Sequence, residues 1–121
     1  MSGASRFEDL IAWQFARELT KCIYSTCAQG NLAKDFGLRN QIQRASVSAM
    51  SNIAEGFERR GDKQFAHFLT IAKASCAEVR SLLYVALDAG YLTHHEFDAL
   101  QHHADKTGRV IAGLHRVVAS S

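Results

Sequence analysis

The stretch that decides the fold is Gln41-Ile-Gln-Arg-Ala-Ser-Val-Ser-Ala-Met-Ser-Asn-Ile-Ala-Glu-Gly56. At about 100° per residue it indicates a helix whose polar side chains fall within roughly 80° and whose apolar side chains fill roughly 200°. The polar stripe comprises Gln41, Arg44, Ser48, Asn52, Glu55 and Arg59. The apolar arc comprises Ile42, Ala45, Val47, Ala49, Met50, Ile53, Ala54 and Phe57. Because a one-sided surface helix shows an apolar stripe of only about 100°, this helix is expected to be covered by more than one neighbour.

Working outward from this stretch, apolar residues recur at spacings of three and four through most of the chain. This periodicity predicts four helices, over about 7–28, 38–57, 63–89 and 94–118. Gly30 and Gly90 are expected to end the first and third helices, because glycine adopts the left-handed conformation with which a chain leaves a helix. Asp62 is the expected N-cap of the third helix. Thr93 and Glu96 form a capping-box sequence that is expected to begin the fourth.

The fold class follows from these segments and from the composition. The chain has 121 residues, 47% of them hydrophobic, and no proline, so we expect a single packed domain over residues 1–121 with long uninterrupted helices. Strand signals, such as alternating β-branched runs and hairpin turns, are absent from the sequence. Short loops between helices of similar length favour antiparallel neighbours. The sequence therefore predicts an all-α, antiparallel up-down four-helix bundle.

Composition also bounds the location of the protein and the classes of its partners. The formal net charge of +2 neither demands nor excludes nucleic acid, because a local basic patch matters more than the total. The three cysteines lack zinc-type spacing and are expected to be free thiols in a reducing cytoplasm. No apolar run approaches the roughly 18 residues of a membrane span, and residues 1–5 lack the pattern of a signal peptide. We therefore expect a cytoplasmic protein with no membrane partner.

Seven basic side chains lie mainly on the second and third predicted helices and on the turn between them. They are Arg39, Arg44, Arg59, Arg60, Lys63, Lys73 and Arg80. If they converge, they form a candidate nucleic-acid-binding surface, because clustered lysines and arginines neutralise backbone phosphates. The alternative is a scattered, solvated face. Four interleaved acidic residues favour that alternative: Glu55, Glu58, Asp62 and Glu78.

The polar stripe of the second helix has two main interpretations. As a structural feature, Gln41, Ser48 and Asn52 would satisfy one another or backbone groups between helices or subunits. Glu55 and Arg59, four residues apart, would pair on the helix surface. As a functional feature, the stripe would be a surface for RNA or protein, or the lining of a catalytic pocket.

Histidines gather on the fourth predicted helix, at His94-His95 and His102-His103. Asp98 and His102 are four residues apart, a spacing that suits two metal ligands on one helix. A third ligand at a suitable spacing is not evident, so exposed histidines and no bound metal are expected. The chain also lacks a P-loop, a glycine-rich dinucleotide turn, a Ser-His-Asp order and paired catalytic carboxylates. We therefore expect no cofactor and no enzymatic activity.

Residues spread over nearly the whole chain match a family pattern. The most specific part contains Gln41, Arg44, Ser48, Asn52, Glu55 and Gly56, and the glycine allows a close backbone approach or a change of direction. Further matches are the aromatic opening 7–13, Phe65, Phe68-Leu69, Ala72, Ser75, Glu78 and Gly90-Tyr91-Leu92. With these residues the chain resembles the bacterial four-helix-bundle proteins encoded within intervening sequences of 23S ribosomal RNA. Two departures favour regular helix: Ala74 replaces a frequent glycine, and residues 49–51 lack a frequent proline.

The resemblance implies a homo-oligomer, typically a five-fold ring of bundles. It also implies a relation to the accessory proteins of diversity-generating retroelements, which bind a reverse transcriptase and nucleic acid through a basic surface. The expected function is therefore a non-enzymatic adaptor that presents a repeated basic surface to RNA or to a protein–RNA complex. Its expected partners are further copies of itself, RNA or DNA, and a nucleic-acid-handling protein. The alternative is a protein-interaction scaffold without nucleic-acid binding, and an enzyme or a metal-binding protein comes third.

Overall fold

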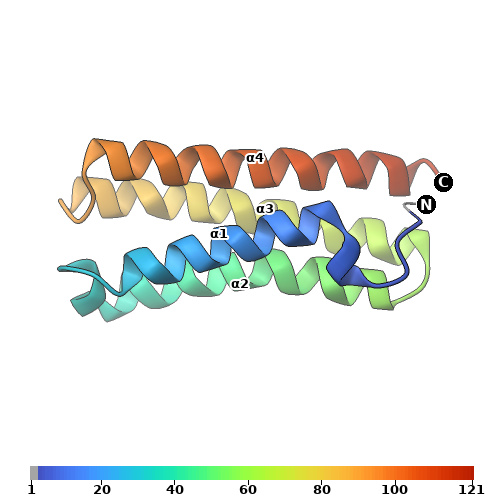
Figure 1. Ribbon diagram of the computed structural model, residues 1–121, viewed down its shortest axis with the longest axis horizontal. Coiled ribbons are helices and arrows are strands. Elements are labelled where there is room, and N and C mark those ends of the chain that lie inside the picture. The colour runs from blue at the N-terminus through green and yellow to red at the C-terminus, as the bar shows by residue number, and fades with distance from the viewer. Residues whose placement is uncertain (1–2) are drawn as a thin grey trace.

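The computed structural model describes residues 3–121, which form four α-helices and two short 3-10 helices and contain no strand (Figure 1). In chain order the elements are η1 (Phe7–Asp9), α1 (Ile11–Cys27), η2 (Leu32–Lys34), α2 (Phe36–Glu58), α3 (Asp62–Asp88) and α4 (His94–Ala119). Residues 1–2 of the predicted domain 1–121 lie outside the described residues. The predicted all-α class is confirmed.

The four α-helices lie side by side, and each runs antiparallel to the helix before it (Figure 1). α1 packs against α2 and α4, and α3 also packs against α2 and α4. Neighbours in sequence are therefore neighbours in space, and the first described residues lie at the same end of the molecule as the C-terminus (Figure 1). This arrangement confirms the up-down four-helix bundle, while the homo-oligomeric ring stays a prediction.

The first helix begins later than predicted. Phe7–Asp9 form a separate 3-10 turn, Leu10 has an extended backbone with ψ of 126°, and α1 begins at Ile11. The break has a packing reason, because Leu10 is only 3% exposed. The Phe7 ring also meets the Trp13 ring edge-on, with 5.2 Å between the centroids. The aromatic opening therefore folds against α1 instead of extending it.

The starts of α3 and α4 test two sequence predictions. Asp62 is not the N-cap of α3, because Gly61 takes that position with an extended backbone (φ −140°, ψ 134°). Asp62 is instead the first helical residue, where its carboxylate still lies at the positive end of the helix dipole. The capping box of α4 is confirmed: the Glu96 amide donates to Thr93 Oγ1 at 3.1 Å, and the Thr93 amide donates to Glu96 Oε1 at 2.9 Å.

Asp35 organises one end of the bundle. α2 begins at Phe36, earlier than predicted, because Asp35 Oδ1 accepts a hydrogen bond from an amide of the first helical turn at 3.1 Å. Asp35 Oδ2 accepts a second hydrogen bond, at 2.9 Å, from the Tyr91 hydroxyl. Gly90, with φ of 79°, ends α3 as predicted and places Tyr91 directly after the turn. The carboxylate thereby ties the α1–α2 connection to the α3–α4 connection.

The wide apolar arc of α2 is covered by two neighbours, as predicted, because α2 packs against both α1 and α3. Ile42, Ala49 and Ile53 are at most 1% exposed, whereas Val47 at the edge of the arc remains 36% exposed. Other fully buried large side chains come from the remaining three helices: Leu19, Ile23, Phe65, Leu69, Leu83 and Ile111. The hydrophobic core therefore receives side chains from all four helices, and its burial is the main term that stabilises the bundle.

Candidate nucleic-acid interface

The middle of the α2 polar stripe forms a hydrogen-bonded network with α3. Ser48 Oγ and Ser75 Oγ lie 2.8 Å apart, and Ser75 Oγ also donates to the Ile71 carbonyl at 3.1 Å. The Asn52 side-chain amide donates to the Ser48 carbonyl at 2.8 Å and to Ser48 Oγ at 3.0 Å. Ser75 is only 6% exposed, so these groups satisfy one another where water has little access. The structural interpretation is therefore correct for this part of the stripe.

The two ends of the stripe lie outside this network. Gln41, Arg44 and Glu55 are exposed, so the prediction that Gln41 joins the network is wrong. The predicted Glu55–Arg59 ion pair is absent from the described ion pairs. Instead, the Arg59 guanidinium lies over the Phe68 ring, with 5.1 Å between Cζ and the ring centroid. Arg59 is thereby directed toward α3.

Gly56 allows α2 and α3 to approach closely beside this arginine. A Cβ added at Gly56 would lie 2.6 Å from Phe68 Cβ and 3.1 Å from Phe65 Cδ1. The expected close approach is confirmed, and α2 continues through Gly56 to Glu58. Because Phe68 packs directly on the α2 backbone, the ring on which Arg59 lies has a defined position.

Four of the seven predicted nucleic-acid-binding residues line two hollows that α3 contributes to. Lys73 and Arg80 line a hollow of about 210 Å³ between α3 and α4. Arg59 and Lys63 line a wider hollow of about 650 Å³ near the α2–α3 turn, to which α4 also contributes. All four residues are exposed.

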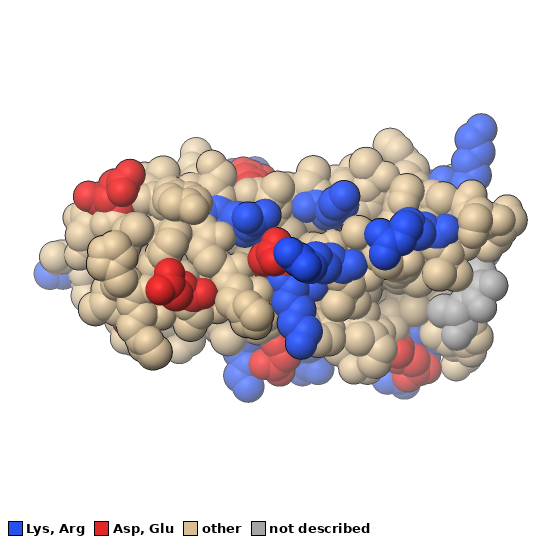
Figure 2. Space-filling model, turned by 90° about the horizontal axis from the view of Figure 1, so that it is seen from above, with Lys and Arg blue, Asp and Glu red and all other residues tan. Residues whose placement is uncertain are grey.

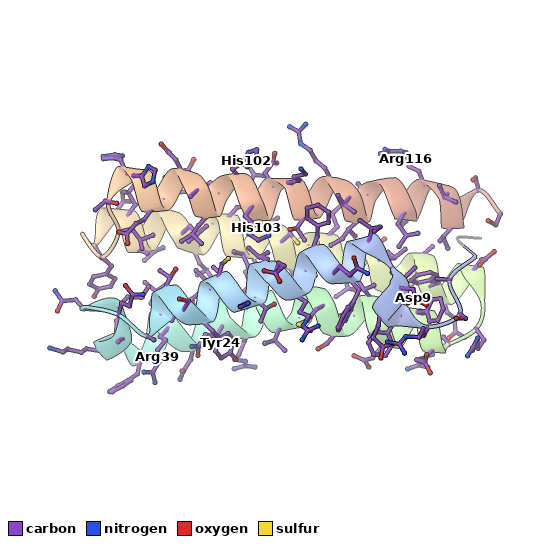
Figure 3. The ribbon with its side chains drawn as sticks, in the orientation of Figure 1. Asp9, Tyr24, Arg39, His102, His103 and Arg116 are labelled. Carbon is purple, nitrogen blue, oxygen red and sulfur yellow. The ribbon has the colours of Figure 1, made fainter. Side chains whose placement is uncertain are left out.

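α4 adds cations that sequence reasoning missed. Arg109 lines the smaller hollow together with Lys73 and Arg80. The Asp105 carboxylate holds two of these guanidinium groups: Oδ2 lies 3.0 Å from Arg109 Nε, and Oδ1 lies 3.5 Å from Arg80 Nη1. Arg116 lies further along α4 and points away from the bundle (Figure 3). The signal in the sequence is the seven-residue spacing of Arg109 and Arg116, which is about two helical turns and places both on one stripe.

Seen from the side of α4, basic side chains gather over the middle and the right of the molecule, with few acidic side chains among them (Figure 2). We call this surface the α3–α4 basic face. We define it by the cations that line the two hollows, Arg59, Lys63, Lys73, Arg80 and Arg109, together with Arg116 of α4.

Three predicted residues do not line these hollows. Arg39 lies near the start of α2, far from Arg116 (Figure 3), where it donates to a carbonyl of η2 at 2.9 Å and lies over the Phe36 ring at 4.8 Å. About 30 Å of helix separates it from Arg59 at the other end of α2. Arg44 is exposed on α2, and Arg60 occupies the turn after α2 with φ of 64°. A role of these three residues in nucleic-acid binding stays a prediction.

A family model described as 23S rRNA-intervening sequence protein matches residues 8–113. The chain belongs to this family. A solved structure from Bacteroides thetaiotaomicron, described as a protein with unknown function from the S23 ribosomal protein family, has a TM-score of 0.77 to this chain. The two chains are 20% identical, over 86% of this chain and 97% of that one, so the likeness shows the fold. A comparison with curated proteins found no match.

Membership of the 23S rRNA-intervening sequence protein family confirms the resemblance that the motif residues indicated. In the structure these motif residues fall into two groups. Ser48 and Gly56 contact α3, and Asn52 donates hydrogen bonds to Ser48 within α2, whereas Gln41, Arg44 and Glu55 lie at the surface. α2 and α3 also run without interruption through the positions where the family often has proline or glycine.

The histidines of α4 do not form a metal site with neighbouring side chains. His94, His95 and His102 are exposed, and no group of three potential ligands occurs within residues 3–121. His103 is half-buried toward α1, and burial lowers the pKa of its imidazole while the nearby Glu18 carboxylate opposes that shift. Protonation of His103 is therefore less favourable in the folded protein than in the unfolded chain.

The two buried thiols, Cys27 and Cys76, are also poor candidates for chemistry. The three cysteines are free, as predicted. Burial raises the pKa of Cys27 to about 11 and the pKa of Cys76 to about 12, so both remain protonated at neutral pH.

In the described part of the chain, none of the helices has both the length and the apolar character needed to span a bilayer.

Proposed function

We propose that this member of the 23S rRNA-intervening sequence protein family is a non-enzymatic adaptor that binds RNA or DNA through the α3–α4 basic face. The observation that supports the proposal is the gathering of cations from the end of α2, from α3 and from α4 on one side of the bundle (Figure 2). Phosphate groups are the natural ligands of such a surface, because each contact with lysine or arginine releases condensed counterions.

The smaller hollow explains how these cations would act. Asp105 offsets one positive charge, but it also holds the guanidinium groups of Arg80 and Arg109 in place before a ligand arrives. Gln101 adds to this order, because its side-chain amide donates to the Arg80 carbonyl at 2.7 Å. The described residues that line this hollow include no aromatic ring on which a base would stack. The contacts would therefore reach phosphates and carry little sequence preference.

We further propose that the bundle assembles into a cytoplasmic homo-oligomeric ring, with five copies as the family resemblance predicts. Exposed apolar side chains support self-association: Phe36 is 63% exposed, Ile11 58%, Tyr84 56% and Val85 51%. A ring would repeat the α3–α4 basic face around its axis. Light scattering at micromolar concentration is expected to give a mass near five times the 13.4 kDa of one chain. A monomer mass would overturn this part of the proposal.

A second candidate function is a protein-interaction scaffold without nucleic-acid binding. The same exposed apolar side chains favour it, because they suit contacts with protein rather than with phosphate. Binding measurements separate the two candidates.

The test uses fluorescence anisotropy with a short blunt RNA duplex and an unrelated DNA duplex, each without terminal phosphates, over a series of salt concentrations. We expect weak binding to both duplexes, and for the DNA duplex log affinity should fall against log salt with a slope near −0.9 per phosphate neutralised. The double variant Lys73→Gln, Arg109→Gln should weaken both complexes and flatten the DNA slope by roughly one to two units.

The matched control is Lys21→Gln, Lys34→Gln, which removes the same charge from exposed positions off the α3–α4 basic face. It should change affinity much less. Equal losses in the two double variants would overturn the assignment of this face. No binding at low salt by an oligomeric protein would favour the scaffold.

A further inference from the structure

The wider hollow differs from the rest of the α3–α4 basic face in its shape and its chemistry. Arg59 directly follows α2, Lys63 and His67 lie on α3, and His115 lies on α4. Its volume of about 650 Å³ lies within the range of small-molecule sites. Four nitrogen-bearing side chains that can donate hydrogen bonds to an anion therefore border one concave space.

The charge around this hollow is unbalanced. None of the described residues that line it carries a carboxylate. Arg59 and Lys63 take part in none of the described ion pairs, whereas Asp105 pairs with the arginines of the smaller hollow. Glu55 and Glu58 line a separate, smaller depression together with Arg59, and neither of them lines this hollow. The hollow thus presents two permanent positive charges without an internal counterion.

Aromatic packing gives the hollow a defined wall. Phe68 is half-buried and packs on the backbone at Gly56. The Arg59 guanidinium lies over its ring at 5.1 Å, and the His67 ring meets it edge-on with 5.8 Å between the centroids. Because both side chains rest on the same fixed ring, less conformational entropy is lost when they contact a ligand.

From this geometry we propose that the hollow bordered by Arg59, Lys63, His67 and His115 binds a phosphate monoester carried by a nucleotide. A terminal phosphate bears a charge of roughly −1.5 to −2 at neutral pH, which the two permanent cations can balance. A phosphodiester within a strand bears only one negative charge. The volume exceeds that of a phosphate group, so an attached nucleoside has space beside the exposed His67 ring, on which a base can stack. The inference rests on the proposed function for the source of the phosphate, which is the 5′ end of a strand or a free nucleotide.

The experiment compares one short single-stranded RNA in two forms, with a 5′-phosphate and with a 5′-hydroxyl, each labelled at the 3′ end. Binding is measured by fluorescence anisotropy at pH 7 and low salt with the full-length protein. We expect the phosphorylated strand to bind roughly tenfold more tightly, since a charge-assisted contact is gained. Adenosine monophosphate should displace it, and adenosine should not.

Two variants on α3 test the location. Lys63→Gln should abolish the preference for the 5′-phosphate. Lys73→Gln removes the same charge from the same helix outside the hollow, so it should weaken both strands equally and keep the preference. Both positions are exposed, and thermal melting of each variant confirms that it is folded.

The outcomes separate this inference from the proposed function. Equal affinity of the two strands for the unmodified protein would overturn the monoester site and leave backbone binding in place. A preference that survives Lys63→Gln would overturn the assignment of the site to this hollow. Direct binding of adenosine monophosphate, without binding of either strand, would support the site with a free nucleotide as its ligand and would overturn the proposed function. No binding of any of these probes would overturn both.

Discussion

Replacing Gly56 by alanine tests the packing that holds α2 against α3. The new Cβ would lie 2.6 Å from Phe68 Cβ and 3.1 Å from Phe65 Cδ1. Phe68 Cβ is bonded to the backbone of α3, so rotation of a side chain cannot relieve this contact. The two helices must separate locally, by about 1 Å if an ordinary carbon–carbon distance of about 3.6 Å is to be restored.

The expected effect on stability is the difference between two terms. Overpacking of this kind costs about 1–3 kcal/mol, and the high end applies because a helix backbone must move. Alanine returns about 1 kcal/mol through its higher helix propensity. The net loss in the free energy of unfolding is therefore about 2 kcal/mol, which lowers the Tm of a domain of this size by roughly 8 °C.

The assay is thermal melting followed by circular dichroism, with Gly108→Ala as the matched control. Gly108 is also helical and faces a neighbouring helix, but a Cβ there would lie 3.6 Å from Cys76 Cβ, an ordinary contact. The control should gain up to about 1 kcal/mol from helix propensity alone. If Gly56→Ala melts at or above the temperature of the unmodified protein, the close approach of α2 and α3 leaves room for a Cβ at position 56, and the overpacking argument is wrong.

Three further outcomes follow from the polar and titratable groups. Asn52→Ala should lower the free energy of unfolding by about 1 kcal/mol, because it removes hydrogen bonds inside the α2–α3 network. Glu55→Ala, at an exposed position, should change it little. Equal melting temperatures of the two variants would contradict this. Because burial lowers the pKa of His103 below its unfolded value near 6.5, the unfolded chain binds a proton first and stability falls as the pH drops through that value. Urea titrations at pH 7 and pH 5 should therefore show a smaller acid loss for His103→Gln than for the unmodified protein. Iodoacetamide should label the half-buried Cys22 before Cys76, because Cys76 is 1% exposed and its pKa is raised to about 12. Mass spectrometry of the digested protein reports the order of labelling.

The candidate site was partly predictable from the sequence. The motif residues indicate that α2 is special, and Lys73 and Arg80 belong to the predicted basic set that borders the smaller hollow. The sequence does not indicate that Ser75 is the partner of Ser48, or that Arg109 shares a hollow with Lys73. Such pairs depend on the relative rotation and register of two helices, which packing of the whole bundle sets.

The sequence by itself determined the number, order and type of the helices and most of their boundaries. Those features depend on local physics: the 3.6-residue period of apolar side chains, the Thr93 capping box and the glycine that ends α3. Tertiary structure alone decided that the Tyr91 hydroxyl reaches Asp35, that Ser75 meets Ser48, and that Arg109 shares a hollow with Lys73. Each of these outcomes joins residues distant in the chain, and no local propensity encodes the distance between them.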